Sequence, residues 1–261
     1  MQLFSCSSDK SIKLWNLDEM SYVETLYGHS NGITSIDALI RDRAVTSGGR
    51  DNSIRIWKVP EESHLVLNGN VYILKHVHYF ISYNNLNENF NENIISIKLV
   101  SKGNKVVSCR NFFFLIGCLE SIDCVKLLNE NNCISGGDGG NVCLWSNLKK
   151  KPIFTLKEAH GKDIHSDSPN WIVSLATYTY SDFFASGSFN GIINFYMCDE
   201  KFKSFSKCFE TKVDGNINCM AFTNDGRYLI VGIGQEHRMG RWHKKKEVKN
   251  CILLMPLIKK S

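Results

Sequence analysis

The sequence lacks several features that identify whole classes of protein. Its longest apolar run, FFFLIGCL at 112–119, is too short to cross a bilayer as a helix. The N-terminal stretch MQLFSCSSDK has no basic region followed by an apolar run, so it does not resemble a secretory signal. We therefore expect a protein of the cytosol or nucleus that has no membrane partner.

Patterns typical of metal and cofactor sites are also missing. The ten cysteines are scattered without a CxxC pair, which argues against a zinc site and favours reduced thiols. GGDGGN at 136–141 resembles a phosphate-binding loop, but no Lys-Ser or Lys-Thr follows it. No nucleophile lies beside a base in a catalytic pattern. The sequence predicts a binding protein rather than an enzyme, with no metal, no cofactor and no small-molecule substrate.

The charge balance narrows the choice of partner only slightly. Lysine and arginine total 31 against 26 aspartate and glutamate residues, which gives a formal net charge of +5. This small basic excess permits an acidic partner such as RNA and does not require one.

The sequence does contain a repeat. FSCSSDKSIKLW, TSGGRDNSIRIW and ISGGDGGNVCLW end at Trp15, Trp57 and Trp145, and the first two tryptophans are 42 residues apart. Weaker copies are ASGSFNGIINFY, with Tyr196 at the tryptophan position, and IVGIGQEHRMGRW, which ends at Trp242. Each copy predicts a β-hairpin, because small residues end one strand, a Gly/Asp/Asn turn follows, and a β-branched run leads to the aromatic residue. A period of about 40–45 residues is typical of WD40 propeller blades.

By similarity to WD blades, the second copy is expected to bury a hydrogen-bonded set made of His29, Ser47, Asp51 and Trp57. Buried polar groups in a sheet need hydrogen-bond partners, and these four would supply them to one another. The set could be mistaken for a catalytic triad, but none of its members is a nucleophile aimed at a cleft. We expect the set to be structural.

The regular spacing breaks between Trp57 and Trp145, which are 88 residues apart. A hidden extra blade is one explanation, but it leaves no room for its fourth strand. Removing residues 70–115, which contain nine asparagines, restores a spacing of 42. We interpret residues 70–115 as an insertion, either a disordered loop or translated non-coding sequence. Transcript sequencing across codons 68–118 would decide between the two.

The predicted fold class is all-β, a WD40 β-propeller with about four to five blades of a ring expected to have seven. Residues 1–69 are expected to hold a partial first blade, a complete second blade and the start of the third. Residues 70–115 are the insertion, and residues 116–261 hold the remainder of the third blade, the fourth and an irregular fifth. Because Met1 lies directly before a strand, we expect a fragment of a longer protein.

Five strings closely resemble one family. They are YVETLYGH (22–29), TSGGRDNSIRIWKVPEESHLV (46–66), SIDCVKLLNENNCISGGDGGNVCLW (121–145), KEAHG (157–161) and VGIGQEHRMGRWHKKKEVKN (231–250). The family is the WD-repeat subunit of the U3 small nucleolar ribonucleoprotein, a ribosomal RNA processing factor. Its most specific string here is GQEHRMGRW, where a generic blade has a short Asp-Gly turn. The insertion, and LNGN at 67–70 in place of a Gly-His, depart from the family pattern.

The resemblance implies a non-catalytic protein of the nucleus and nucleolus. Its propeller would bind U3 small nucleolar RNA and support processing of pre-ribosomal RNA for the small ribosomal subunit. Other proteins of the U3 particle and of the small-subunit processome would be its further partners. The alternative is a generic protein-interaction scaffold, such as a ubiquitin-ligase receptor or a signalling adaptor, because propellers have many functions. The cationic, expanded turn at GQEHRMGRW favours RNA.

Basic side chains in loops are the candidates for RNA contact. Arginine binds phosphate bidentately and stacks on exposed bases, and lysine adds a salt-sensitive attraction. The candidate RNA-binding residues are His237, Arg238, Arg241, Lys244, Lys245, Lys246 and, in the turn of the second blade, Arg50. Gly240 is expected to free the backbone for an unusual turn between the two neighbouring arginines. The alternative for the three lysines is a solvated loop between blades.

Overall fold

The computed structural model describes residues 2–38, 43–69, 78–80, 97–100, 106–109, 120–163, 166–238 and 240–257. The chain divides into two units. The first unit comprises Met1–Asn70 and Glu120–Ser261, and the second comprises Val71–Leu119.

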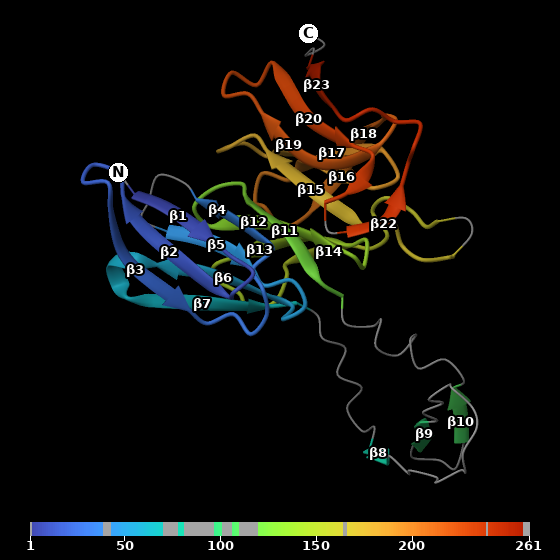
Figure 1. Ribbon diagram of the computed structural model, residues 1–261, viewed down its shortest axis with the longest axis horizontal. Coiled ribbons are helices and arrows are strands. Elements are labelled where there is room, and N and C mark those ends of the chain that lie inside the picture. The colour runs from blue at the N-terminus through green and yellow to red at the C-terminus, as the bar shows by residue number, and fades with distance from the viewer. Residues whose placement is uncertain are drawn as a thin grey trace. The chain divides into compact units, whose positions relative to one another are not determined.

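Three four-stranded antiparallel sheets form consecutive blades of the first unit (Figure 1), and in each the strands are paired in chain order. The second blade contains β4 (Ser35–Ala38), β5 (Arg43–Ser47), β6 (Ser53–Lys58) and β7 (Ser63–Asn68), with the 3-10 helix η1 (Val59–Glu61) between β6 and β7. The third contains β11 (Ile122–Leu127), β12 (Asn132–Gly137), β13 (Val142–Ser146) and β14 (Phe154–Leu156). The fourth contains β15 (Ile172–Thr177), β16 (Phe183–Ser188), β17 (Ile192–Cys198) and β18 (Phe205–Lys212).

The first and fifth blades have three strands each among the described residues. The first contains β1 (Gln2–Cys6), β2 (Ser11–Asn16) and β3 (Ser21–Tyr27). The fifth contains β19 (Asn216–Phe222), β20 (Tyr228–Gly234) and β23 (Cys251–Pro256). A separate hairpin, β21 (Glu236–His237) and β22 (Gly240–Lys244), lies in the chain between β20 and β23. The prediction that the fifth copy, IVGIGQEHRMGRW, forms a single hairpin is therefore wrong. Its first part lies in β20, which pairs with β23, and its remainder forms the separate hairpin β21–β22.

The predicted start of the third blade within residues 1–69 is wrong. Strand β7 pairs with β6 as the outermost strand of the second blade, and all four strands of the third blade follow residue 120. A repeat counted from one tryptophan to the next joins the outer strand of one sheet to the inner strands of the following sheet. The boundaries of the sequence repeat and of the sheet therefore differ by one strand.

The second unit contains a three-stranded sheet in the order β10-β9-β8. Its strands are β8 (His78–Phe80), β9 (Ile97–Val100) and β10 (Val106–Cys109). The interpretation of residues 70–115 as a disordered loop or translated non-coding sequence otherwise lies outside the described residues.

The turn of the second blade shows why its sequence folds as a hairpin. Gly49 and Asn52 adopt positive φ angles of 55° and 53°, a conformation that glycine and asparagine tolerate best. Between them, Asp51 accepts hydrogen bonds from the backbone N–H and the hydroxyl of Ser53, at 2.9 and 2.8 Å. These local bonds reverse the chain between β5 and β6.

The hydrophobic core lies between neighbouring blades. Val45 and Ile54 of the second blade belong to the same buried cluster as Val125 and Trp145 of the third. The next cluster joins the third blade to the fourth in the same way and includes the fully buried ring of Phe184. Burying each large apolar side chain contributes roughly 1.5–3 kcal/mol, so adjacent blades stabilise one another. In the part of the chain that the structure describes, no helix is long and apolar enough to span a membrane.

Candidate RNA-binding face

The second blade buries a polar set beside its turn. His29 Nδ1 lies 2.6 Å from a carboxylate oxygen of Asp51, and His29 Nε2 lies 2.8 Å from Thr46 Oγ1. Trp57 Nε1 donates to the same threonine oxygen at 2.8 Å. Burial opposes the charge on Asp51, but hydrogen bonds with His29 and Ser53 outweigh it and lower its pKa. His29, Asp51 and Trp57 are thus brought together as a structural set.

Ser47 is not the hydroxyl of this set, so that prediction is wrong. The second-blade hairpin is one residue longer than the third-blade hairpin. Trp57 pairs across the ladder with Ala44, thirteen positions earlier, whereas Trp145 pairs with a residue twelve positions earlier. Aligning the copies on tryptophan therefore shifted the hydroxyl position by one residue. Because neighbouring side chains of a strand face opposite ways, Ser47 instead lies with its Oγ 2.9 Å from Thr34 Oγ1.

The fourth blade contains a related set that sequence reasoning missed. His160 Nε2 lies 2.6 Å from Ser186 Oγ, which is 3.4 Å from the hydroxyl of Tyr196. Burial lowers the pKa of His160 to about 3, so the ring is neutral at physiological pH. The signal was present in the sequence, because KEAHG supplies a histidine and Ser186 stands ten residues before the aromatic position.

The candidate RNA-binding residues of the fifth blade belong to an arm, which we define as residues 235–250, between β20 and β23. Two asparagines of β19 fix its beginning. Asn216 donates to the carbonyl of Gln235 at 2.9 Å, and Asn218 donates to the carbonyl of Glu236 at 2.9 Å. Asn218 also accepts the backbone N–H of Arg238 at 3.0 Å. The arm is therefore held firmly against its own blade.

The arm also reaches the third and fourth blades. Arg238 Nη2 donates to the backbone carbonyl of Asp123 in β11 at 2.6 Å. Lys245 Nζ donates to the carbonyls of Phe189 and Gly215, at 2.9 and 3.2 Å, and burial lowers its pKa. These bonds join the arm to a strand and to loops that are far from it in the sequence. Lys245 is thereby engaged within the protein.

His237 also faces the protein interior. Its side chain is buried, and its ring meets Trp171 edge-on with centroids 5.2 Å apart. Trp171 begins the loop-to-strand entry of the fourth blade, so this contact is another link between the arm and that blade. His237 is therefore a packing residue in this structure.

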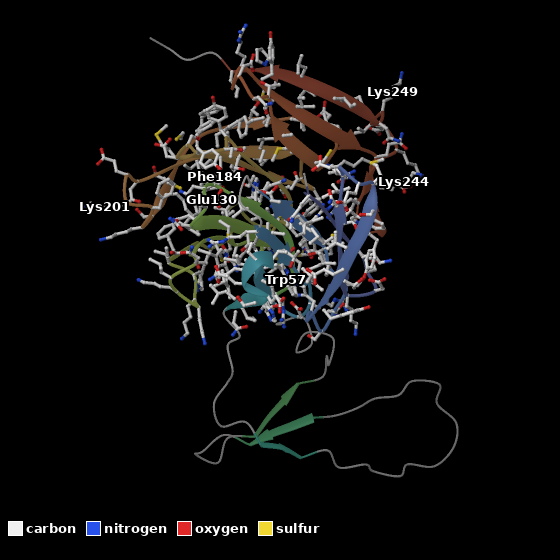
Figure 2. The ribbon with its side chains drawn as sticks, turned by 90° about the vertical axis from the view of Figure 1, so that its left-hand side faces the viewer. Trp57, Glu130, Phe184, Lys201, Lys244 and Lys249 are labelled. Atoms are coloured by element: carbon white, nitrogen blue, oxygen red, sulfur yellow. The ribbon has the colours of Figure 1, made fainter. Side chains whose placement is uncertain are left out.

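The remaining basic residues of the arm are more accessible. Lys244 forms an ion pair with Glu236 at 2.9 Å, and its side chain is 46% exposed. Lys246 and Lys249 are exposed. Figure 2 shows Lys244 and Lys249 at the same margin, with their amino groups directed outward. The prediction for the side chain of Arg241 lies outside what the structure describes.

Arg50 lies beside the same part of the protein as Arg238. It lines a hollow of about 270 Å³ together with Asp123, Asp138 and Trp171. Burial raises the pKa of Asp123 to about 6 in spite of a hydrogen bond from Ser121, and burial also raises the pKa of Asp138. Arg50 and Arg238 favour the charged form of Asp123. The hollow thus mixes both signs of charge, which reduces its attraction for phosphate.

Histidine, cysteine and carboxylate side chains do not gather into a metal-binding group anywhere in the described ranges. The geometry suits binding through a surface. A firmly anchored arm presents lysines to solvent, and the buried polar sets stabilise the second and fourth blades.

Comparisons with known proteins agree with this architecture. The WD domain, G-beta repeat family matches residues 1–16 and 20–58. Ribosomal RNA-processing protein 9 of Saccharomyces cerevisiae is 30% identical over 271 residues, covering 92% of this chain and 45% of that protein. U3 small nucleolar RNA-interacting protein 2 of Mus musculus is 38% identical over 141 residues, covering 52% of this chain and 29% of that protein.

A solved structure of RRP9 WD40 repeats is also similar. It has a TM-score of 0.77 and 36% identity, and the match covers 98% of this chain and 64% of the solved chain. The predicted all-β WD40 propeller fold is therefore confirmed. The chain spans less than half the length of the two relatives above.

Proposed function

Because this chain is a WD-repeat protein homologous to ribosomal RNA-processing and U3 small nucleolar RNA-interacting proteins, we propose that it binds U3 small nucleolar RNA as a non-catalytic subunit of the U3 particle. In this role it supports processing of pre-ribosomal RNA for the small ribosomal subunit in the nucleolus. Its further partners are proteins of the U3 particle and of the small-subunit processome. The anchored arm, residues 235–250, is the observation that carries the proposal.

The arm suits RNA for a physical reason. Lysines on a flexible loop lose conformational freedom when they bind, whereas an arm held by hydrogen bonds to three blades is already ordered. Its exposed ammonium groups attract phosphates and release counterions from the RNA. An ordered cationic edge also matches a folded RNA better than a mobile tail does.

The contacts divide the candidates into two roles. Lys245 and His237 position the arm, because both are engaged with neighbouring blades. Arg238 positions the arm through one nitrogen, and the rest of its exposed side chain can donate to phosphate. The direct contacts are made by Lys244, Lys246 and Arg241 of the predicted set, with Arg50 in a lesser role. The structure adds Lys249, which follows the predicted run.

The test is recovery of RNA with the tagged full chain, followed by sequencing. We expect enrichment of U3 small nucleolar RNA, reduced about tenfold by Lys246→Gln/Lys249→Gln. With purified chain and U3 RNA, the same variant should lower the slope of log affinity against log salt by about 1.5, since each phosphate contact of a single strand contributes about 0.7. Both lysines are exposed, so the variant should fold normally.

A matched control is Lys201→Gln/Lys203→Gln, which removes two exposed lysines of the fourth blade. Figure 2 shows Lys201 at the margin opposite Lys244. The control should recover U3 RNA as well as the unaltered chain. Equal losses in both variants would indicate general charge attraction, and no loss in either would place RNA binding away from the arm.

A further inference from the structure

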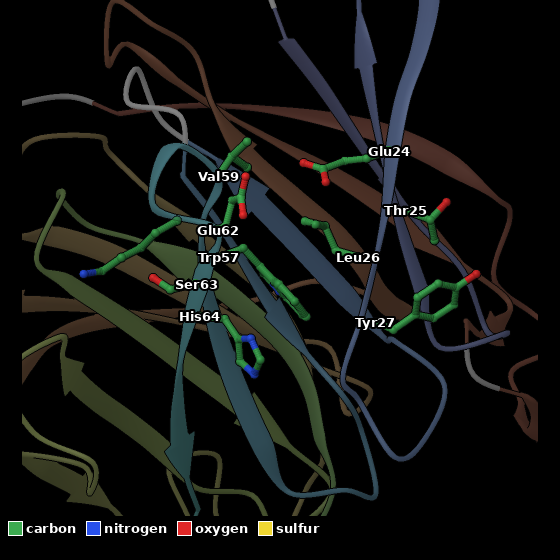
Figure 3. Close-up of a pocket in the computed structure, with 10 residues that line it drawn as sticks. Glu24, Thr25, Leu26, Tyr27, Trp57, Val59, Glu62, Ser63 and His64 are labelled. Carbon is green, nitrogen blue, oxygen red and sulfur yellow. The ribbon is translucent and has the colours of Figure 1, made fainter.

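A groove lies between the first and second blades, away from the arm. Its volume is about 260 Å³, and it is lined by strand β3 on one side and by the end of β6, η1 and the start of β7 on the other. Figure 3 shows Leu26 of β3 and Trp57 of β6 facing one another across it. The helix η1 joins β6 to β7 at the end of the blade opposite to the turn 48–52. The groove therefore includes the blade end opposite to the one at which Arg50 lies.

The floor of the groove is apolar. Leu26 and Val59 are half-buried, and Trp57 is buried between them and the core. The ring of His64 stacks against Trp57, with centroids 4.8 Å apart and an interplanar angle of 34°. Burial and the guanidinium of Arg55, whose Nη1 lies 2.6 Å from His64 Nε2, lower the pKa of His64, so the ring favours its neutral form. One aliphatic side chain fits such a floor.

The rim of the groove is acidic. Glu24 and Glu62 line it, and neither carboxylate has an ion pair with any residue in the described ranges. Lys58 also lines the groove, but its ammonium is held by Glu61 at 2.8 Å. Figure 3 shows the Glu24 carboxylate extending from β3 toward Glu62 on the opposite wall. Two unpaired carboxylates that face each other form a natural position for a cationic side chain.

The next junction between blades also has a cavity, but a much smaller one. Arg43, Ile56, Leu127 and Cys133 help to line its cavity, which has a volume of about 10 Å³. Room for about one water molecule remains there, whereas the groove beside β3 could hold several heavy groups. The groove beside β3 is thus much larger than this cavity and similar in volume to the hollow that contains Arg50.

We propose that the groove binds a short basic segment of a protein partner. A leucine-sized side chain of the segment packs on Leu26 and Trp57. A flanking lysine or arginine places its charge between Glu24 and Glu62. Tyr27 stands at the edge, 70% exposed, where its ring can cover the bound segment. The acidic rim repels phosphate, so this surface selects protein over RNA and leaves the arm free.

The test is fluorescence anisotropy with the full chain and a labelled heptapeptide that has a central leucine flanked by two lysines on each side. Two control peptides replace the four lysines or the leucine by serine. We expect saturable binding of the first peptide and at least tenfold weaker binding of both controls. Glu24→Gln/Glu62→Gln, which preserves the shape of both side chains, should weaken binding of the first peptide about tenfold.

A matched variant is Glu200→Gln, which removes an exposed carboxylate from the β17–β18 connection of the fourth blade and should leave binding unchanged. Circular dichroism and the thermal midpoint establish that each variant is folded. Should the double variant fail to fold, photo-crosslinking of the peptide to the unaltered chain must label the stretch 24–27 or 57–64. Equal binding of all three peptides, or crosslinks elsewhere, would overturn the proposal. It would also be overturned if a labelled RNA bound the unaltered chain and lost that binding in the Glu24→Gln/Glu62→Gln variant.

Discussion

The polar sets of the second and fourth blades occupy equivalent buried positions, but only the set of the second blade includes a carboxylate. In the second blade, Asp51 accepts from His29, which also meets Thr46. In the fourth, Asn190 stands at the position of the acid, and its side chain bonds to backbone groups instead. His160 Nδ1 is buried there without a hydrogen-bond partner among the described residues. A hydroxyl and an aromatic ring are therefore sufficient as partners of the histidine in a blade. The carboxylate of the second blade adds a charge that the fourth blade lacks.

Loss of the aromatic residue should have the largest effect in both blades. Trp57→Ala and Tyr196→Ala should each lower the free energy of unfolding by about 3–5 kcal/mol, because each removes a large buried ring. Phenylalanine variants sharpen the comparison. Trp57→Phe should cost about 1 kcal/mol more than Tyr196→Phe, because the tryptophan makes a 2.8 Å hydrogen bond and the tyrosine a 3.4 Å one. Urea unfolding measures both differences, and equal costs would contradict the assigned hydrogen bonds.

Loss of the shared hydroxyl should have an intermediate effect in the second blade. Thr46→Val keeps the volume but leaves His29 and Trp57 without their common partner, at a cost of about 2 kcal/mol. Ser47→Ala is the matched neighbour and should cost about 1 kcal/mol or less, because Thr34 keeps its bond to the carbonyl of Ile122. Chemical unfolding of the two variants checks the order. If Ser47→Ala cost more unfolding free energy than Thr46→Val, Ser47 and not Thr46 would be the hydroxyl of the polar set.

At neutral pH the smallest predicted effect is that of His160, because its pH dependence develops only as the pH falls below about 6.5. The folded ring protonates near pH 3, whereas an unfolded histidine protonates near pH 6.5, so the unfolded chain binds more protons in between. The free energy of unfolding should therefore fall as the pH falls below about 6.5. The slope contributed by this one residue is at most about 1.4 kcal/mol per pH unit. His160→Gln should flatten the profile between pH 6 and pH 4, and profiles that stay parallel would rule out the buried neutral ring.

Much of the fold could be predicted from the sequence, because it depends on local signals that repeat. A turn rich in Gly, Asp and Asn, followed by a β-branched run and an aromatic residue, specifies a hairpin wherever it occurs. The first four copies, from FSCSSDKSIKLW to ASGSFNGIINFY, accordingly each form a hairpin within one sheet, whereas the fifth copy is divided between β20 and the separate hairpin β21–β22. The start of the third blade was misplaced because hydrogen bonding, rather than the sequence period, assigns β7 to the second blade.

The candidate site was only partly predictable. Basic residues of the arm were recognised from their types, but a charge in a sequence does not show what it contacts. Lys245 and Arg238 bond to backbone carbonyls of other blades, which carry no sequence signal at all. The error at Ser47 has a similar origin, because one additional residue in a hairpin changes which side chains share a face.

The sequence by itself determined the hairpins of the first four copies, the buried aromatic positions of the second, third and fourth, and the basic character of the irregular fifth copy. These properties depend on neighbouring residues, so a short string suffices to encode them. The tertiary structure decided that Thr46 completes the polar set, that Lys245 and His237 turn inward, and that the groove beside β3 stays open. Each of these depends on how side chains of different blades meet, and such contacts exist only after the blades have packed against one another.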